Sequence, residues 1–256
     1  MTLDVIGIVM LRVDTRTAKS HVYQVMMFLI PRMSDPNKMV RKAVVQLVMR
    51  LMQATSPVVV IGMMSDNVRH KSPRVRQLTV DIVTAALLTR PRNEFNLPAL
   101  CAVAVPALAD PKKGVRHAAM ECVAVIAQAL GAGKLQPLMT ELAVLEAAEP
   151  RCEGVTAAVQ ARLARRQLPS VADDGLVDYA VLASGRGSSA GADVDWVKGG
   201  SSYAVDSPVR SDSFEVKPRS TSPPPSRTYG GVSAKSLSKL PWEREPTEVC
   251  SKQANT

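Results

Sequence analysis

Aromatic residues are scarce in this sequence, at 4% of 256 residues, while apolar residues make up 46%. A core of useful size must therefore be aliphatic, built from Val, Leu, Ala and Met. The scarcity also counts against nucleic acid as a partner, because single-stranded binders interleave aromatic side chains with their basic residues to stack bases.

The chain has only four cysteines, and it lacks a long apolar run. The cysteines have no paired or metal-like spacing, which suits a reducing compartment. The apolar segment 5–11 near the start is too short to cross a bilayer and has no basic residues before it, so neither a signal peptide nor a membrane anchor is predicted. The cytoplasm is the expected location.

Catalytic and metal-binding patterns are also missing. The three histidines, His21, His70 and His117, have no carboxylate or cysteine at ligand spacing. The Gly185-Arg186-Gly187 triplet has no strand before it and no helix after it, so it is no phosphate loop. The sequence predicts no enzyme, no metal site and no cofactor.

Positive charge is present and unevenly placed. Residues 1–169 carry 22 Lys and Arg against 12 Asp and Glu, which gives +10, whereas residues 170–256 carry 10 against 11, which gives −1. An acidic partner is therefore expected to meet the first part of the chain.

A repeated pattern organises this basic part. Pro31, Asp35, Val40 and Arg41 have the spacing of Pro106, Asp110, Val115 and Arg116, and Gly62, Asp66, Val75 and Arg76 match them if four residues are inserted before the Val-Arg pair. The Val-Arg pairs recur 35 and then 40 residues apart. This period is typical of stacked two-helix repeats.

Each Val-Arg pair begins an apolar stripe at offsets 0, 3, 4, 7, 8 and 11, the pattern of a helix buried on one side. Seventeen of these eighteen positions are apolar, Thr79 being the exception. Shorter apolar helices are expected before them at 22–33, 58–64 and 97–108. A fourth pair is predicted, with Leu135 to Leu145 in its first helix and Val155 to Leu163 in its second.

The predicted fold is all-α: an α-solenoid of HEAT-type helical hairpins over 1–169, followed by a disordered tail. Residues 170–184 form a short flanking segment for which the sequence leaves alternatives open: packing on the last repeat, or a brief strand or helix there. From 185 to 256, Ser, Pro and Gly dominate and no apolar period remains, so this stretch is predicted to be disordered.

Two sets of turn residues are candidates for function. Aspartate and arginine of each repeat can form a structural ladder between layers: Asp35, Arg41, Asp66, Arg76, Asp110 and Arg116. The other basic residues of the turns are expected to share one edge of the stack, as a binding edge or simply as a solvated one: Lys38, Lys42, Arg69, Lys71, Arg74, Lys112 and Lys113.

Serines beside proline occur in the tail, at Ser207-Pro208 and Ser222-Pro223. They suit proline-directed kinases, whose phosphate would make a nearly neutral tail acidic. An ordinary low-complexity linker is the alternative.

The runs 28–35 (FLIPRMSD), 40–43 (VRKA) and 109–116 (ADPKKGVR) resemble HEAT repeats of the TOG-domain type, found in the CLASP and crescerin (TOGARAM) proteins. The stretch from Val159 to Val181 is most similar to the crescerin branch. The resemblance covers about residues 20–182.

This resemblance implies tubulin or microtubule binding through the turns within the repeats, at the basic edge, with a location at the cytoskeleton and in crescerins at the cilium, basal body or centrosome. Two departures stand out. Only about four repeats are present, where TOG domains have about six, and there is no tryptophan before Trp196 to make the first-turn contact of many TOG domains. The alternative is a general HEAT scaffold that grips a protein on its concave helix face.

Overall fold

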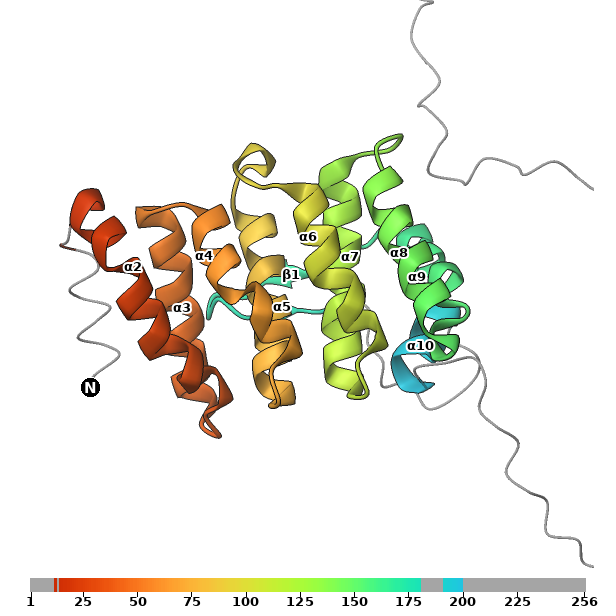
Figure 1. The fold of residues 1–256 in the computed structure, drawn as a ribbon, viewed down its shortest axis with the longest axis horizontal. Helices are drawn as coiled ribbons and strands as arrows, with labels where there is room; N and C mark the ends of the chain where they lie inside the picture. The colour runs from red at the N-terminus through yellow and green to blue at the C-terminus, as the bar shows by residue number, and fades with distance from the viewer. Residues whose placement is uncertain (1–11, 13, 181–190, 200–256) are drawn as a thin grey trace, which may run out of the picture. The chain divides into compact units, whose positions relative to one another are not determined.

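The computed structural model describes residues 12, 14–180 and 191–199. Four helical hairpins stand side by side in chain order (Figure 1). The first helices are α2 (Thr15–Leu29), α4 (Pro57–Met64), α6 (Leu97–Ala104) and α8 (Gln136–Ala148). The second helices are α3 (Lys38–Ala54), α5 (Pro73–Thr89), α7 (Lys113–Leu130) and α9 (Val155–Ala164). The predicted α-solenoid is confirmed.

Short 3-10 helices extend or follow the first helices before each turn. They are η1 (Ile30–Ser34), η2 (Ser65–Arg69), η4 (Val105–Ala109) and η5 (Pro150–Cys152). One more, η3 (Arg92–Glu94), lies in the longer linker between α5 and α6. Within the described residues, no helix is long and apolar enough to cross a membrane.

Local chemistry explains several helix ends. Asn37 caps α3 by accepting a hydrogen bond from the Met39 amide at 2.9 Å, and Asn96 caps α6 by accepting one from Ala99. Proline is the first residue of both α4 and α5, where its missing N–H costs nothing. Helix α7 ends at Gly131, whose φ of 84° favours glycine.

The core follows the predicted stripes. Sixteen of the eighteen stripe positions are buried, and Val40 and Ala43 of the first repeat are half-buried. Thr79, the polar exception, is buried with its hydroxyl donating to the Val75 carbonyl at 2.9 Å. Helix α7 is buried on most sides, because α5, α9 and α10 (Ala192–Gly199) all pack against it.

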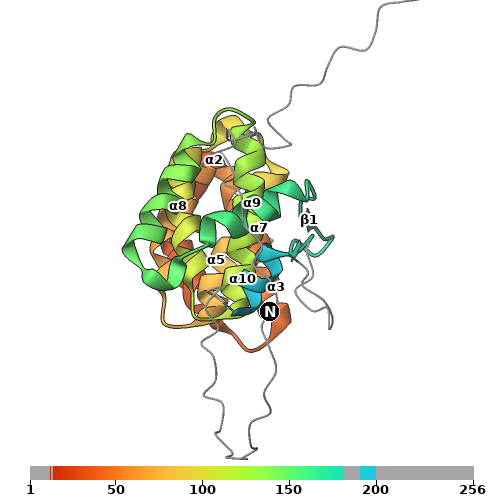
Figure 2. The ribbon, with the colours of Figure 1, turned by 90° about the vertical axis from the view of Figure 1, so that its right-hand side faces the viewer.

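The segment after the last repeat forms a short β-hairpin in its described residues. Strands β1 (Ser170–Val171) and β2 (Val177–Asp178) pair antiparallel and pack on α5. The hairpin tip reaches α3, where the Gln46 amide donates to the Asp174 carbonyl at 3.4 Å. The hairpin thus adds a third layer outside the second helices, as Figure 2 shows from the side.

Helix α10 lies within the range predicted to be disordered, so the prediction is wrong for 192–199. The helix packs against α7 and α9, and Val194, Trp196 and Val197 are buried. Burial of this large apolar surface offsets the entropy of ordering the short helix. Residues 185–190 and 200–256, with the tail serines, lie outside the described residues.

Candidate functional site

The turns that join the first and second helices of the first three repeats lie along one edge of the stack, the lower edge in Figure 1. All three close in the same way, by a side chain that accepts from the amide two residues later. Asp35 Oδ1 accepts from Asn37 at 2.7 Å, His70 Nδ1 from Ser72 at 3.0 Å, and Asp110 Oδ1 from Lys112 at 2.8 Å. Each acceptor lies six residues before the arginine of its repeat.

His70, not Asp66, is therefore the counterpart of Asp35 and Asp110, and the four-residue insert in the second repeat is an error. The 3-10 helices η1, η2 and η4 begin 35 and 40 residues apart, the same intervals as the Val-Arg pairs. Asp66 lies in η2 at the position of Pro31 and Pro106, and it is exposed. The extra residues are in the linker between α5 and α6.

The three arginines use one nitrogen in the same way. Arg41 Nη1 donates to the carbonyls of Asp35 and Pro36 at 2.6 and 2.9 Å. Arg76 Nη1 donates to His70 and Lys71 at 2.8 and 3.2 Å, and Arg116 Nη1 to Asp110 at 2.9 Å. Each guanidinium is thereby held against its own turn, which leaves its Nε and Nη2 edge for other partners.

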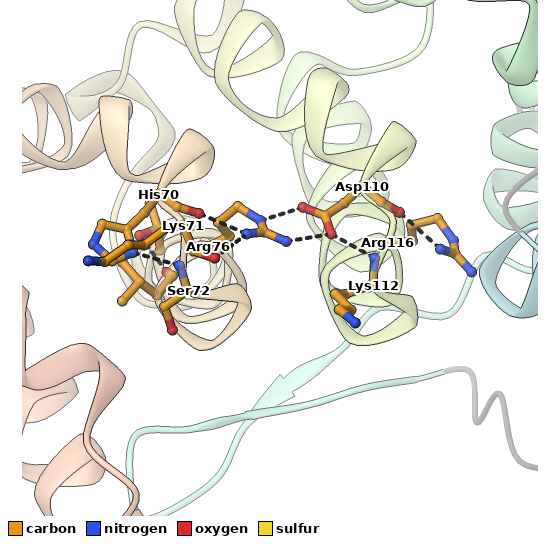
Figure 3. Close-up of polar contacts among 9 residues, drawn as sticks. His70, Lys71, Ser72, Arg76, Asp110, Lys112 and Arg116 are labelled. Atoms are coloured by element: carbon orange, nitrogen blue, oxygen red, sulfur yellow. Dashed lines mark hydrogen bonds and ion pairs between the residues drawn. The ribbon is translucent and has the colours of Figure 1, made fainter.

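The partner of the Nε and Nη2 edge differs between repeats, and Figure 3 shows Arg76 and Arg116. Arg76 holds the Asp110 carboxylate with two bonds, Nε to Oδ2 at 2.5 Å and Nη2 to Oδ1 at 2.9 Å. Arg116 Nη2 instead donates to the last carbonyls of α10, Val197 at 2.7 Å and Lys198 at 3.1 Å. Such carbonyls carry partial negative charge, so they substitute for a carboxylate. Desolvation lowers the pKa of Arg116.

The ladder thus has one ionic rung, between the second and third repeats. Within the described part of the chain, Arg41 has no salt bridge, and the residue at the position of Asp110 in the next repeat is His70.

The basic side chains named from the sequence are accessible along this edge. Six are exposed, and Lys42 is half-buried. The exposed set is Lys38, Arg69, Lys71, Arg74, Lys112 and Lys113. The salt bridge between Arg76 and Asp110 neutralises one arginine of these turns, and the six exposed cations lie around it. The edge therefore keeps a positive field.

A groove of about 410 Å³ lies between α3, α5 and the β-hairpin, next to two of the turns. Its lining combines cations at the helix starts with a polar cluster under the hairpin: Lys38, Arg41, Arg74, Gln77, Leu78, Asp81, Leu176, Val177 and Tyr179. The Tyr179 hydroxyl donates to Asp81 Oδ1 at 2.8 Å and accepts from Gln77 at 3.1 Å. Burial raises the pKa of Asp81 to about 7 and raises that of Tyr179.

His117 serves packing and His70 serves turn geometry. His117 stacks edge-to-face on Tyr179, with ring centroids 4.4 Å apart, and His21 is exposed. In the described regions, no group of three His, Cys, Asp or Glu side chains could hold a metal ion. The sequence reasoning missed His70, Tyr179 and α10. His70 could have been found from the sequence, because it lies six residues before Arg76. A search for aspartate alone overlooks it.

Comparison with known proteins decides the family. No family model matches the chain. It is 35% identical over 227 residues to mouse TOG array regulator of axonemal microtubules protein 1, and 33% identical over 254 residues to the human protein. These matches cover 85% and 95% of this chain but only 13% and 15% of those relatives.

A solved structure from work on how crescerin uses a TOG domain array to regulate microtubules in the primary cilium has the same fold. Its TM-score is 0.65 at 34% identity, covering 71% of this chain and 72% of that one. The chain belongs to the crescerin family of TOG-domain proteins. In this crescerin-type array, the hairpin and α10 are arranged around four repeats.

Proposed function

We propose that this chain binds tubulin or microtubules through the basic edge of its intra-repeat turns and so regulates microtubule organisation, at the cytoskeleton and specifically in the cilium. The observation that carries the proposal is the alignment of three turns along one edge, with six exposed cations. The tubulin surface is acidic, and a positive edge accelerates association with such a surface.

The relatives support the same conclusion. The mouse and human proteins are named for axonemal microtubules, and the crescerin structure concerns microtubule regulation in the primary cilium. Non-enzymatic binding is the proposed activity, and the tail serines are proposed kinase sites.

The test is co-sedimentation of the full chain with microtubules, together with a pull-down of purified tubulin, at low and raised salt. Binding is expected at low salt and should weaken as salt screens the exposed charges. Lys112→Glu with Lys113→Glu should abolish it. The matched control reverses two exposed lysines away from these turns, Lys19 and Lys134, and should retain most binding. Absence of binding at low salt would contradict the proposal.

A general scaffold function is the second candidate, and one feature favours it. An apolar groove of about 240 Å³ lies between α4 and α6, on the first-helix face. Its lining is mainly Val58, Ile61, Gly62, Phe95, Ala99, Leu100 and Val103. A partner bound there would be insensitive to the Lys112 and Lys113 reversals. Gly62→Leu would block it, because a side chain at Gly62 meets open space in this groove.

A further inference from the structure

The break in the arginine ladder leaves a guanidinium fork facing a groove. Arg76 shows what the fork does when the next repeat supplies an acid: Nε and Nη2 take the two oxygens of Asp110. Arg41 is fixed to its own turn by the same Nη1 contacts. At the position of Asp110, the next repeat has His70, whose Nδ1 is already used to accept from Ser72.

The surroundings of Arg41 are those of an anion site. Lys38 and Arg74 line the same groove, so three cations converge on it from the starts of α3 and α5. The groove's one carboxylate, Asp81, is engaged by the Tyr179 hydroxyl at 2.8 Å. Its volume of about 410 Å³ and its open side admit a carboxylate side chain from outside.

We infer that the groove between α3, α5 and the β-hairpin binds a carboxylate side chain of the protein partner, held bidentately by Arg41 and flanked by Lys38 and Arg74. The external acid takes the place that Asp110 takes on Arg76 one repeat later. Bidentate pairing with arginine gives geometric specificity as well as charge attraction. The inference rests on the proposed function. The carboxylate belongs to an acidic residue of tubulin, which enters this groove.

The decisive variant adds the missing acid to the chain itself. His70→Asp keeps an acceptor for the Ser72 amide and places a carboxylate opposite Arg41, so it should compete with the external acid. We expect a five- to tenfold loss of tubulin affinity with an unchanged or raised melting temperature, the tenfold limit corresponding to about 1.4 kcal/mol. His70→Asn is the matched control, because it keeps the acceptor without charge, and it should bind like wild type.

Arg41→Lys supplies an independent measurement, since it keeps the charge but removes the fork. It too should bind several times more weakly, and thermal unfolding checks that its turn remains folded. If His70→Asp binds as well as His70→Asn, or if a normally folded Arg41→Lys binds like wild type, the inference is overturned. In that case, if the Lys112→Glu and Lys113→Glu variant still loses binding, the proposed function stands although the carboxylate site does not.

A second arm separates this inference from the proposed function. A short polyglutamate peptide should raise the melting temperature of the wild-type full chain and of His70→Asn, but not of His70→Asp. Stabilisation by the peptide without any tubulin binding would overturn the proposed partner while supporting the carboxylate site. An equal shift in all three proteins would overturn the site.

Discussion

Glu121 and Arg162 form a buried ion pair between the third and fourth repeats, each with a side chain only 1% exposed. Arg162 Nε and Nη2 donate to the two carboxylate oxygens at 3.0 and 2.7 Å, and Nη1 donates to the Gln167 carbonyl. Glu121 also accepts from the Ala180 amide at 3.2 Å. The pair joins α7 to α9 and to the segment that leaves the hairpin.

Arg162→Met should destabilise the protein by about 3–5 kcal/mol, because it strands the Glu121 carboxylate in the core. The double variant Arg162→Met with Glu121→Leu should recover most of that loss, since no charge then remains buried. Urea unfolding of both variants measures the difference. If Arg162→Met lowers the free energy of unfolding by only a few tenths of a kcal/mol, water must reach the Glu121 carboxylate.

Asp81 should make stability depend on pH. Burial raises its folded pKa to about 7 from the 3.8 of the free side chain, so the folded state holds a proton that the unfolded state has released. Stability therefore falls as pH rises from about 4 to about 7 and changes no further above that. Asp81→Asn keeps an acceptor for Tyr179 and should remove a loss on the order of 4 kcal/mol, since each pKa unit corresponds to about 1.4 kcal/mol. Subtracting its unfolding profile from that of wild type isolates the effect, and parallel profiles would refute it.

Single residues show where sequence patterns succeed. The spacing of Asp110 and Arg116 predicted a turn acid and a ladder arginine, and Arg76 does pair with Asp110. The second repeat was misread because aspartate was matched by identity, whereas the turn needs only a side-chain acceptor two residues before an amide. The Nδ1 of His70 meets that need. As a result, the described residues place no acid of the next repeat's turn on Arg41, and only the structure reveals this.

Among the elements, α10 is a built-in cap of the array. Trp196 is 2% exposed, and its Nε1 donates to the Leu108 carbonyl at 3.1 Å. Arg165 holds Asp193 through two bonds of 2.6 and 2.8 Å, and the other end of the helix accepts from Arg116.

Trp196→Ala should therefore cost about 3–5 kcal/mol, the usual penalty for emptying a buried tryptophan site. Trp196→Phe should cost less, on the order of 1–2 kcal/mol, because it keeps the ring contacts and leaves only the Leu108 carbonyl without its donor. Thermal and urea unfolding compare the two. Equal melting temperatures for wild type and Trp196→Ala would mean that α10 does not stabilise the repeats.

Long periodic elements were predictable, and short ones were not. The second helices of the repeats have an apolar stripe that local sequence displays in full, so their burial could be anticipated. The eight residues of α10 form too few turns to be stable alone, and their stability comes from contacts with α7 and α9. The local signals were Gly191 before the helix, Gly199 at its last position and the Val194-to-Val197 spacing.

Over the whole described array, residues 170–180 and 191–199 together contact every repeat in turn. It meets α3 through Gln46, α5 through Asp81, α7 through Glu121 and α9 through Arg165. Repeat arrays ordinarily contact only their nearest neighbours, which allows the repeats to unfold in parts. Because these two described stretches contact all four repeats between them, they couple the repeats instead.

The full chain should accordingly unfold in one cooperative transition, with equal calorimetric and van't Hoff enthalpies. Combining Tyr179→Ala with Trp196→Ala removes two anchors of the segment and should uncouple the repeats, so the transition broadens and the van't Hoff enthalpy falls below the calorimetric one. Hydrogen exchange should then show the first repeat opening before the third, because α7 stays packed between α5 and α9 while α3 loses the hairpin. A single sharp transition in that double variant would show that neighbour contacts alone make the array cooperative.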